Sequence, residues 1–231
     1  MVDVPSARAR MVEVDLVRRG IVDRPVLDAF ETIRREAFVA ADLEGHAYTD
    51  APLPIGEGQT ISQPYVVALT VQALGLRGDE RVLEVGTGSG YAAAILSCVA
   101  KEVFTIERVA VLAASAEERL RRLGFDNVHV ALGDGSLGLP AHGPYDAIAV
   151  AAGGPKAPPA LLAQLAVGGR LVMPIGADET SQLLVRITRE SETSYRHEPL
   201  TAVQFVPLIG EQAWAVSPDE VDPAATAGAR R

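Results

Sequence analysis

Short apolar runs alternate with segments of helical spacing through the middle of the chain. Apolar runs bounded by turn residues predict strands, and apolar positions that recur every three or four residues predict helices. Strands separated by helices are typical of a parallel sheet covered on both faces, so we expect an α/β fold with a Rossmann-like, doubly wound sheet. The expected strands are Val82–Val85, Val103–Ile106, Val128–Ala131, Ala147–Val150 and Arg170–Met173, and the expected helices are Tyr91–Val99, Ala110–Leu123 and Ala160–Leu165.

The helical signals stop after Gly176. Two further apolar runs, Gln182–Thr188 and Thr201–Pro207, follow one another with only a polar connection between them. Strands in direct succession favour antiparallel pairing. The sheet should therefore be mostly parallel, with antiparallel strands at its C-terminal edge.

The N-terminal third has a different pattern. Apolar residues recur at helical spacing through residues 6–40 with a break at Gly20, which predicts two helices that form an N-terminal helical cap. Residues 46–63 are rich in Pro and Gly, which predicts a long ordered loop with a function. A further helix is expected from Pro64 to about Leu74, since Pro is favoured in a first helical turn.

These elements predict one integrated domain in three parts. Residues 1–78 should form the helical cap and a loop for substrate and catalysis, and residues 79–211 the cofactor-binding core. Residues 212–231 hold too few apolar side chains to fold alone and should form a disordered tail.

Composition narrows the class of protein. Of 231 residues 48% are hydrophobic, enough for one substantial core. We see no apolar run of about 18 residues, and the N-terminus lacks the apolar stretch of a signal peptide, so we expect a cytoplasmic protein with no membrane partner. A net charge of −9 opposes binding to nucleic acid. The four histidines are scattered, which predicts no metal site.

Cys98 is the sole cysteine and cannot form an intramolecular disulfide. Its apolar neighbours Ile95, Leu96 and Val99 place it on the expected buried side of a helix. We therefore expect an unreactive thiol in the core.

The first strand runs directly into a glycine-rich turn. Gly86, Thr87, Gly88, Ser89 and Gly90 follow it and precede a helix, so that a ligand can approach the backbone closely. Their G-x-G-x-G spacing differs from the G-x-G-x-x-G of dinucleotide-binding proteins. The alternative is a tight strand-to-helix turn with no ligand.

A carboxylate two residues before this turn, Glu84, suits a ligand that carries an amine and a positive charge. S-adenosylmethionine, with its sulfonium and ammonium groups, fits that description. We therefore expect Glu84 and the five turn residues to bind this cofactor.

Two more acidic residues stand at the ends of later strands. Glu107 lies nineteen residues beyond Gly88, where a carboxylate can accept hydrogen bonds from ribose hydroxyls. Asp134 and Gly135 follow the third strand, and Asp134 could accept from the adenine amino group. Asp-Gly is also common in ordinary turns, so that alternative stays open for Asp134.

Residues 48–64 resemble the signature loop of the protein-L-isoaspartate(D-aspartate) O-methyltransferase family. The resemblance continues in the family's order through residues 82–91, 133–135, 168–176 and 205–210. It implies a class I methyltransferase that transfers the methyl group of S-adenosylmethionine to the free α-carboxylate of L-isoaspartyl residues. The products would be S-adenosylhomocysteine and a methyl ester that cyclises to a succinimide. Partners would be isoaspartyl-containing proteins and peptides, and we expect a monomer.

The resemblance also implies site residues within this loop. Ser62 matches the serine that the family holds in its active site, Thr60 stands beside it, and Gln59 joins the cofactor-binding set. A carboxylate is already ionised at neutral pH, so we assign Ser62 and Thr60 to positioning the acceptor and not to proton transfer. Ser62 also precedes a helix, and capping that helix is the alternative role.

One segment departs from the family's pattern. After the fourth strand the family commonly reads Ala-Ala-Ala-Pro, whereas this chain has Gly153 and Gly154 before Pro155. We expect these glycines to widen or loosen the pocket wall and so to affect substrate preference.

Other functions stay open at this point. A methyltransferase of the same fold could modify a specific aspartyl peptide, a nucleic acid or another small acceptor. Amino-group DNA methyltransferases carry an Asn/Asp-Pro-Pro-aromatic run after the fourth strand, which is absent here. A nicotinamide-dependent oxidoreductase conflicts with the glycine spacing and with Glu84, and a binding module without catalysis requires an activity assay to exclude it.

Overall fold

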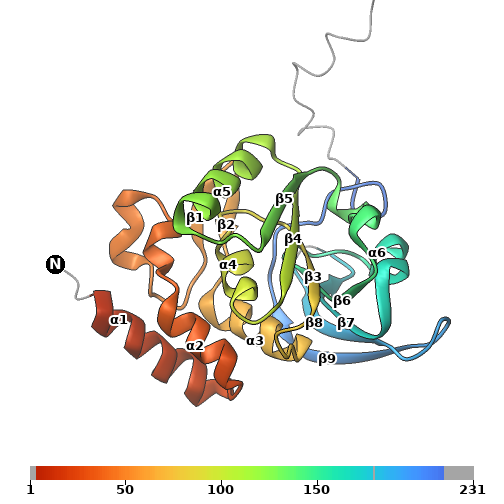
Figure 1. The fold of residues 1–231 in the computed structure, drawn as a ribbon, viewed down its shortest axis with the longest axis horizontal. Helices are drawn as coiled ribbons and strands as arrows, with labels where there is room; N and C mark the ends of the chain where they lie inside the picture. The colour runs from red at the N-terminus through yellow and green to blue at the C-terminus, as the bar shows by residue number, and fades with distance from the viewer. Residues whose placement is uncertain (1–3, 179, 216–231) are drawn as a thin grey trace, which may run out of the picture.

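A computed structural model describes residues 4–178 and 180–215, and a seven-stranded sheet lies at its centre (Figure 1). The strand order is β5-β4-β3-β6-β7-β8-β9. Neighbours from β5 to β7 are parallel, whereas β8 and β9 are added antiparallel at one edge. The predicted doubly wound sheet with an antiparallel edge is therefore confirmed. The strands are β3 (Arg81–Val85), β4 (Glu102–Glu107), β5 (Val128–Leu132), β6 (Tyr145–Val150), β7 (Leu165–Gly176), β8 (Gln182–Arg189) and β9 (Tyr195–Val203).

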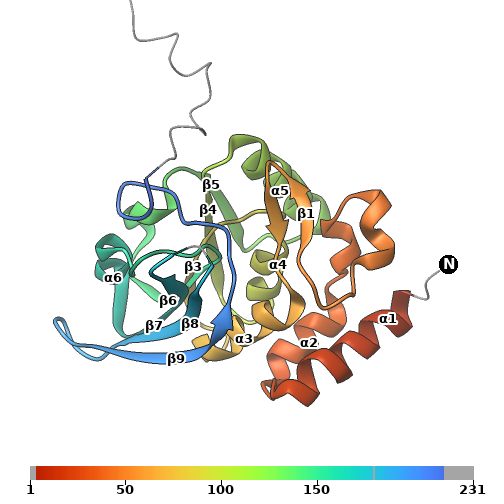
Figure 2. The ribbon, with the colours of Figure 1, turned by 180° about the vertical axis from the view of Figure 1, so that it is seen from behind.

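Helices cover both faces of the sheet (Figures 1 and 2). Successive strand residues point to opposite faces, so Val82 joins the core beneath α3, α4 and α5, while Leu83 joins the core beneath α6. Within residues 4–178 and 180–215, no helix is long and apolar enough to cross a membrane. The helices are α3 (Pro64–Leu74), α4 (Tyr91–Ser97), α5 (Ala110–Leu123) and α6 (Pro159–Gln164).

The N-terminal helical cap packs outside α3 and α4, as predicted (Figure 2). Helix α1 (Val4–Arg10) continues as a π-helical turn (Met11–Leu16) and a 3₁₀ turn (Val17–Arg19), and α2 spans Arg24–Thr32. Gly20 separates them with a φ of 93°. Two short 3₁₀ turns, Arg35–Phe38 and Ala41–His46, then lead toward the expected loop.

Residues 46–63, expected to be a loop, contain a β-hairpin. Strand β1 (Leu53–Gly56) pairs antiparallel with β2 (Gln59–Ile61). Glu57 and Gly58 form the turn with φ values of 51° and 67°. Two-residue hairpin turns favour positive φ at both positions because their twist then matches that of the strands. In these short strands exposed residues alternate with half-buried ones, and Ile61 alone of the two strands is fully buried. So few buried apolar positions give no recognisable strand pattern in the sequence.

The second strand of the C-terminal edge, β9, begins earlier in the chain than predicted. Strand β9 starts at Tyr195 and ends at Val203, so the predicted strand over 201–207 was wrong at both ends. An edge strand exposes much of its surface and can be polar there, which is why Arg196 and Glu198 resembled a connection.

The folded chain also continues beyond residue 211, where the tail was expected to begin. The backbone N–H of Trp214 donates to the Leu208 carbonyl at 3.0 Å, and its indole Nε1 donates to the Gly153 carbonyl at 3.1 Å. The remainder of the expected tail, residues 216–231, lies outside the described residues.

Cys98 is exposed, so the prediction of a core thiol was wrong. Helix α4 ends at Ser97, and Cys98 is its C-cap, with Sγ donating to the Ala94 carbonyl at 3.5 Å. The helical period that placed Cys98 on the buried side ends before it reaches that residue.

Gly153 and Gly154, expected to widen or loosen a pocket wall, lie in backbone that is hydrogen-bonded to neighbouring segments. The Gly153 N–H donates to the Val206 carbonyl at 2.8 Å, and the Gly154 N–H donates to the Pro174 carbonyl at 3.1 Å. A Cβ at Gly153 would lie 2.4 Å from Nε2 of Gln182, whose carboxamide fills that space. The same carboxamide accepts from Phe205 N at 2.9 Å and donates to Phe205 O at 3.1 Å.

Substitution Gly153→Ala should therefore destabilise the protein. The added methyl group displaces the Gln182 carboxamide and leaves the Phe205 backbone without its partners, at a cost of about 1–3 kcal/mol. Urea unfolding measures this loss. Gly45→Ala is a matched control, since a Cβ there meets nothing within 4 Å. Equal unfolding free energies for Gly153→Ala and wild type would show that the hydrogen bonds between the Gln182 carboxamide and the Phe205 backbone do not depend on a glycine at position 153.

Candidate active site

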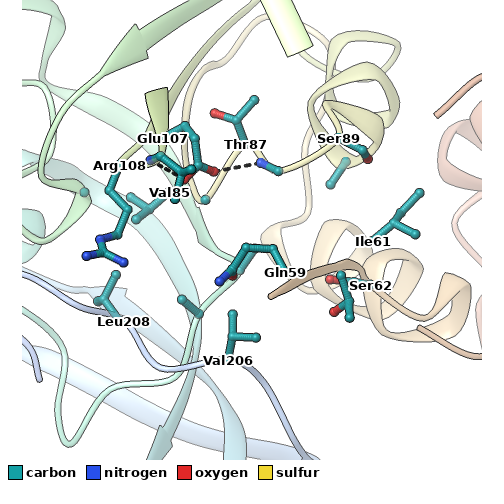
Figure 3. A pocket seen from close by; sticks show the side chains of 18 of the residues that line it. Gln59, Ile61, Ser62, Val85, Thr87, Ser89, Glu107, Arg108, Val206 and Leu208 are labelled. Carbon is teal, nitrogen blue, oxygen red and sulfur yellow. Dashed lines mark hydrogen bonds between the residues drawn. The ribbon is translucent and has the colours of Figure 1, made fainter. Parts of the chain in front are cut away.

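A cavity of about 240 Å³ opens at the carboxyl ends of β3, β4 and β6 (Figure 3). The hairpin supplies one wall from Glu57 to Ser62, and the glycine-rich turn supplies another from Gly86 to Ser89. Residues 206–209, which follow β9, close the opposite side. Ligands of open α/β sheets bind in this position, outside the carboxyl ends of the strands.

Most predicted site residues meet in this cavity, although they come from distant parts of the chain. The residues that line it are Gln59, Thr60, Ser62, Gly86, Thr87, Gly88, Ser89, Glu107 and Gly135. The predicted residues that do not line it are Glu84, Gly90 and Asp134.

The glycine-rich turn needs its glycines for backbone conformation. Gly86, Gly88 and Gly90 have φ values of 95°, 51° and 86°, a region that other residues rarely adopt. Gly90 begins α4 and packs against Leu120, where a Cβ would come within 3.1 Å. Gly90 therefore shapes the turn without facing the cavity.

Glu107 ties the turn to the end of β4. Its Oε2 accepts from the Gly88 N–H at 2.9 Å and its Oε1 accepts from the Val109 N–H at 3.0 Å (Figure 3). Each carboxylate oxygen can accept more than one hydrogen bond, so both retain acceptor capacity at the cavity wall. The predicted contact with ribose hydroxyls stays a prediction.

Glu84 lies behind the large cavity, in a smaller one of about 30 Å³ that it shares with Ser62 and Thr70. The Thr105 hydroxyl donates to Glu84 Oε2 at 2.6 Å, whereas Oε1 is buried and has no hydrogen-bond partner among the described residues. Burial, together with a smaller contribution from the nearby Glu107 carboxylate, raises the pKa of Glu84 to about 8, although the Thr105 hydrogen bond acts in the opposite direction. Glu84 is thus a buried acid with one carboxyl oxygen paired and the other unpaired among the described residues.

Asp134 has structural partners on both carboxylate oxygens. Oδ1 accepts from the Ser136 N–H at 2.8 Å, and Oδ2 accepts from the Glu211 N–H at 2.8 Å. Despite partial burial, these hydrogen bonds lower the pKa of Asp134. Asp134 therefore stabilises the local turn, and a hydrogen bond from its carboxylate to the adenine amino group stays a prediction.

Ser62 lines both cavities but does not cap α3, so the capping alternative was wrong. The N-cap residue is Gln63, and its side chain makes no capping bond. Instead Asp50, fifteen residues before Tyr65, accepts from the Tyr65 N–H at 3.0 Å. The Ser62 side chain is half-buried and Thr60 is exposed on β2.

Several wall residues were not singled out from the sequence. Arg108 follows Glu107 directly and lies near Leu208 in Figure 3. The segment 206–209 belongs to a stretch that carried the family resemblance, so that stretch was the available signal. Within the described ranges, no cluster of three or more His, Cys, Asp or Glu could hold a metal ion.

Comparison with known proteins agrees with this arrangement. The family model described as protein-L-isoaspartate(D-aspartate) O-methyltransferase matches residues 7–213. A protein-L-isoaspartate O-methyltransferase 1 from Rhodopseudomonas palustris strain HaA2 is 56% identical over 93% of this chain and 88% of its own length. A protein-L-isoaspartate O-methyltransferase 2 from Marinobacter nauticus is 54% identical over 92% of this chain and 97% of its own length.

Solved structures give the same result. A protein-L-isoaspartate O-methyltransferase superposes with a TM-score of 0.81 and 30% identity, covering 89% of this chain and 67% of that one. A structure from Plasmodium falciparum, determined in complex with S-adenosyl-L-homocysteine, superposes with a TM-score of 0.74 and 27% identity over 90% of this chain and 99% of that one. The chain belongs to the protein-L-isoaspartate(D-aspartate) O-methyltransferase family.

Proposed function

We propose that the protein transfers the methyl group of S-adenosylmethionine to the free α-carboxylate of L-isoaspartyl residues in damaged proteins and peptides. The observation that carries the proposal is the position of residues 57–62. This part of the family's signature loop forms a wall of the same cavity as the glycine-rich turn and Glu107. Acceptor and methyl donor could therefore meet there.

The residues present fit this cofactor. Glu84 Oε1 is a buried acceptor with no donor among the described residues, which suits an ammonium group reached directly or through one water molecule. Glu107 retains acceptor capacity for ribose hydroxyls, and the positive φ of Gly86 and Gly88 lets a ligand lie against the backbone.

When bound, S-adenosylmethionine would supply a methyl group carried on a sulfonium sulfur. The products would be the methyl ester of the acceptor carboxylate and S-adenosylhomocysteine, which keeps the electron pair of the carbon–sulfur bond. No general base is needed, because a carboxylate with a pKa near 4 is ionised at neutral pH. Ser62 and Thr60, which line the cavity, would hold the acceptor carboxylate in place. Effective molarities near 10⁵ M correspond to about 7 kcal/mol, so positioning supplies a large part of the rate.

The proposed acceptors are polypeptides and not nucleic acids. A net charge of −9 opposes a polyanionic substrate. The methyl ester would then cyclise spontaneously to a succinimide, whose hydrolysis returns part of the damaged sites to normal aspartyl linkages.

A pair of peptides that differ only in an L-isoaspartyl or L-aspartyl linkage tests the function. The isoaspartyl peptide should be methylated with a kcat/KM at least about 10²-fold higher. The linkage displaces the carboxylate, and misplacement by about 1 Å can cost that much. Release of methanol after mild base confirms the ester. Equal rates for the two peptides would overturn the repair function and leave the fold untouched.

Glu107→Ala should weaken binding of S-adenosylhomocysteine by about 1.5–3 kcal/mol, because it removes charge-assisted acceptors and also releases the Gly88 N–H. Isothermal titration calorimetry measures the change. Glu102→Ala, at the other end of β4, is the matched control and should bind normally. If folded Glu107→Ala protein binds S-adenosylhomocysteine with wild-type affinity, Glu107 does not contribute to cofactor binding.

Glu84 should make stability depend on pH. In the folded protein the pKa of the Glu84 carboxyl group is about 8, whereas the pKa of an ordinary Glu is 4.5. Between these values the folded state binds more protons than the unfolded state, so its stability falls as pH rises. Relative to Glu84→Gln, the wild type should lose up to about 1 kcal/mol per pH unit between pH 5 and 8. Urea unfolding of both proteins at each pH tests this, and parallel profiles would contradict it.

A further inference from the structure

Arg35 is a fully buried cation beside the active-site loop. Its side chain is 0% exposed, and it makes no salt bridge with a carboxylate of the described residues. Nε donates to the Ala47 carbonyl at 2.7 Å, and Nη2 donates to the Ser62 carbonyl at 2.9 Å. Two backbone carbonyls therefore take the place of an ion-pair partner.

Such a group is costly to bury. Burial lowers the pKa of Arg35, yet a guanidinium stays protonated at neutral pH. Nη1 is buried and makes no hydrogen bond of ordinary geometry with the described residues, and the guanidinium carbon lies 4.8 Å from the Tyr91 ring centroid. Well-packed apolar residues often replace buried charges without loss of stability. The presence of Arg35 therefore points to a use other than stability.

The two carbonyls that Arg35 holds stand at opposite ends of one segment. Ala47 precedes the hairpin, and Ser62 follows it directly after β2. The guanidinium thus fixes the ends of residues 47–62 to each other from the buried side. Asp50 also links this segment to α3, through the Tyr65 N–H and the Gln63 side chain. Arg35, in contrast, donates directly to the main chain of Ser62.

We propose that Arg35 is a positioning residue for methyl transfer, which holds the Ser62 main chain so that the Ser62 hydroxyl meets the acceptor carboxylate at the cavity wall. This inference rests on the proposed role of Ser62. Arg35 itself does not line the cavity, so it acts through Ser62 and not by contact with cofactor or acceptor. Its planar fork supplies two donors at fixed separation for two acceptors, which a single ammonium group does not reproduce.

The test uses the full-length protein with Arg35→Lys, which keeps the charge, and Arg35→Met, which keeps much of the apolar stem. Both should lower kcat on the isoaspartyl peptide about tenfold or more, because small displacements of a positioning group are amplified in the rate. The dissociation constant of S-adenosylhomocysteine should stay within about twofold, since Arg35 does not line the cofactor cavity.

Arg34→Met is the matched control. Arg34 is the neighbouring residue, its side chain is 72% exposed, and it pairs with Glu36 at 3.0 Å. The kcat of the Arg34→Met protein should equal that of the wild type. Circular dichroism and cofactor affinity establish that each variant is folded. If neither Arg35 variant folds, or if a folded Arg35→Lys protein keeps kcat within about twofold, the proposal is overturned.

A double-mutant cycle with Ser62→Ala separates positioning from a general structural effect. If Arg35 acts through the Ser62 hydroxyl, Arg35→Lys should lower kcat in the wild type but cause little further loss in the Ser62→Ala background. Fully additive losses would overturn the proposal and leave the role of Ser62 intact. A Ser62→Ala protein with normal kcat would overturn both. The peptide pair, measured on the wild type, decides the proposed function independently of either result.

Discussion

The parallel register between β3 and β4 is the constraint on which the site depends. Val85 pairs with Ile106, so the glycine-rich turn and Glu107 begin at the same level of the sheet. The Glu107 carboxylate can then accept from the Gly88 N–H, a charge-assisted bond that joins the two strand ends. A slip of one residue would turn Glu107 to the other face of the sheet. Burial of apolar side chains on both faces sets this register, and core packing thereby shapes the floor of the cavity.

Two buried ionisable side chains near Ser62, Glu84 and Arg35, each have a polar atom with no hydrogen-bond partner among the described residues. Glu84, whose Oε1 is the unpaired atom, lines the smaller cavity together with Ser62, and Arg35, whose Nη1 is the unpaired atom, donates through Nη2 to the Ser62 carbonyl. Unpaired buried polar atoms are uncommon in folded proteins because each costs stability. Their concentration around one serine agrees with the general finding that local rules are broken at functional sites.

The antiparallel edge strands β8 and β9 do not line the cavity, but β8 supports the segment that does. Gln182, at the start of β8, clamps the Phe205 backbone, and Trp214 hydrogen-bonds to both Gly153 and Leu208. These contacts hold residues 206–209 against the cavity. The Gly153 position is therefore part of a packed support for the wall, and the small residue there makes room for a carboxamide.

The sequence by itself determined the features that arise from local pattern. Apolar periodicity established the order of strands and helices, glycine spacing after β3 indicated the turn that lines the cavity, and the family resemblance of residues 48–64 identified the loop with Ser62. These signals are short-range, since strand, helix and turn preferences depend on neighbouring residues. Only the tertiary structure decided which distant groups meet. Asp50, and not Ser62, accepts a hydrogen bond at the start of α3. Gln182 fills the space beside Gly153, and Arg35 donates to the Ser62 carbonyl. Such contacts join residues far apart in the chain, and their geometry follows from how the packed elements lie against one another.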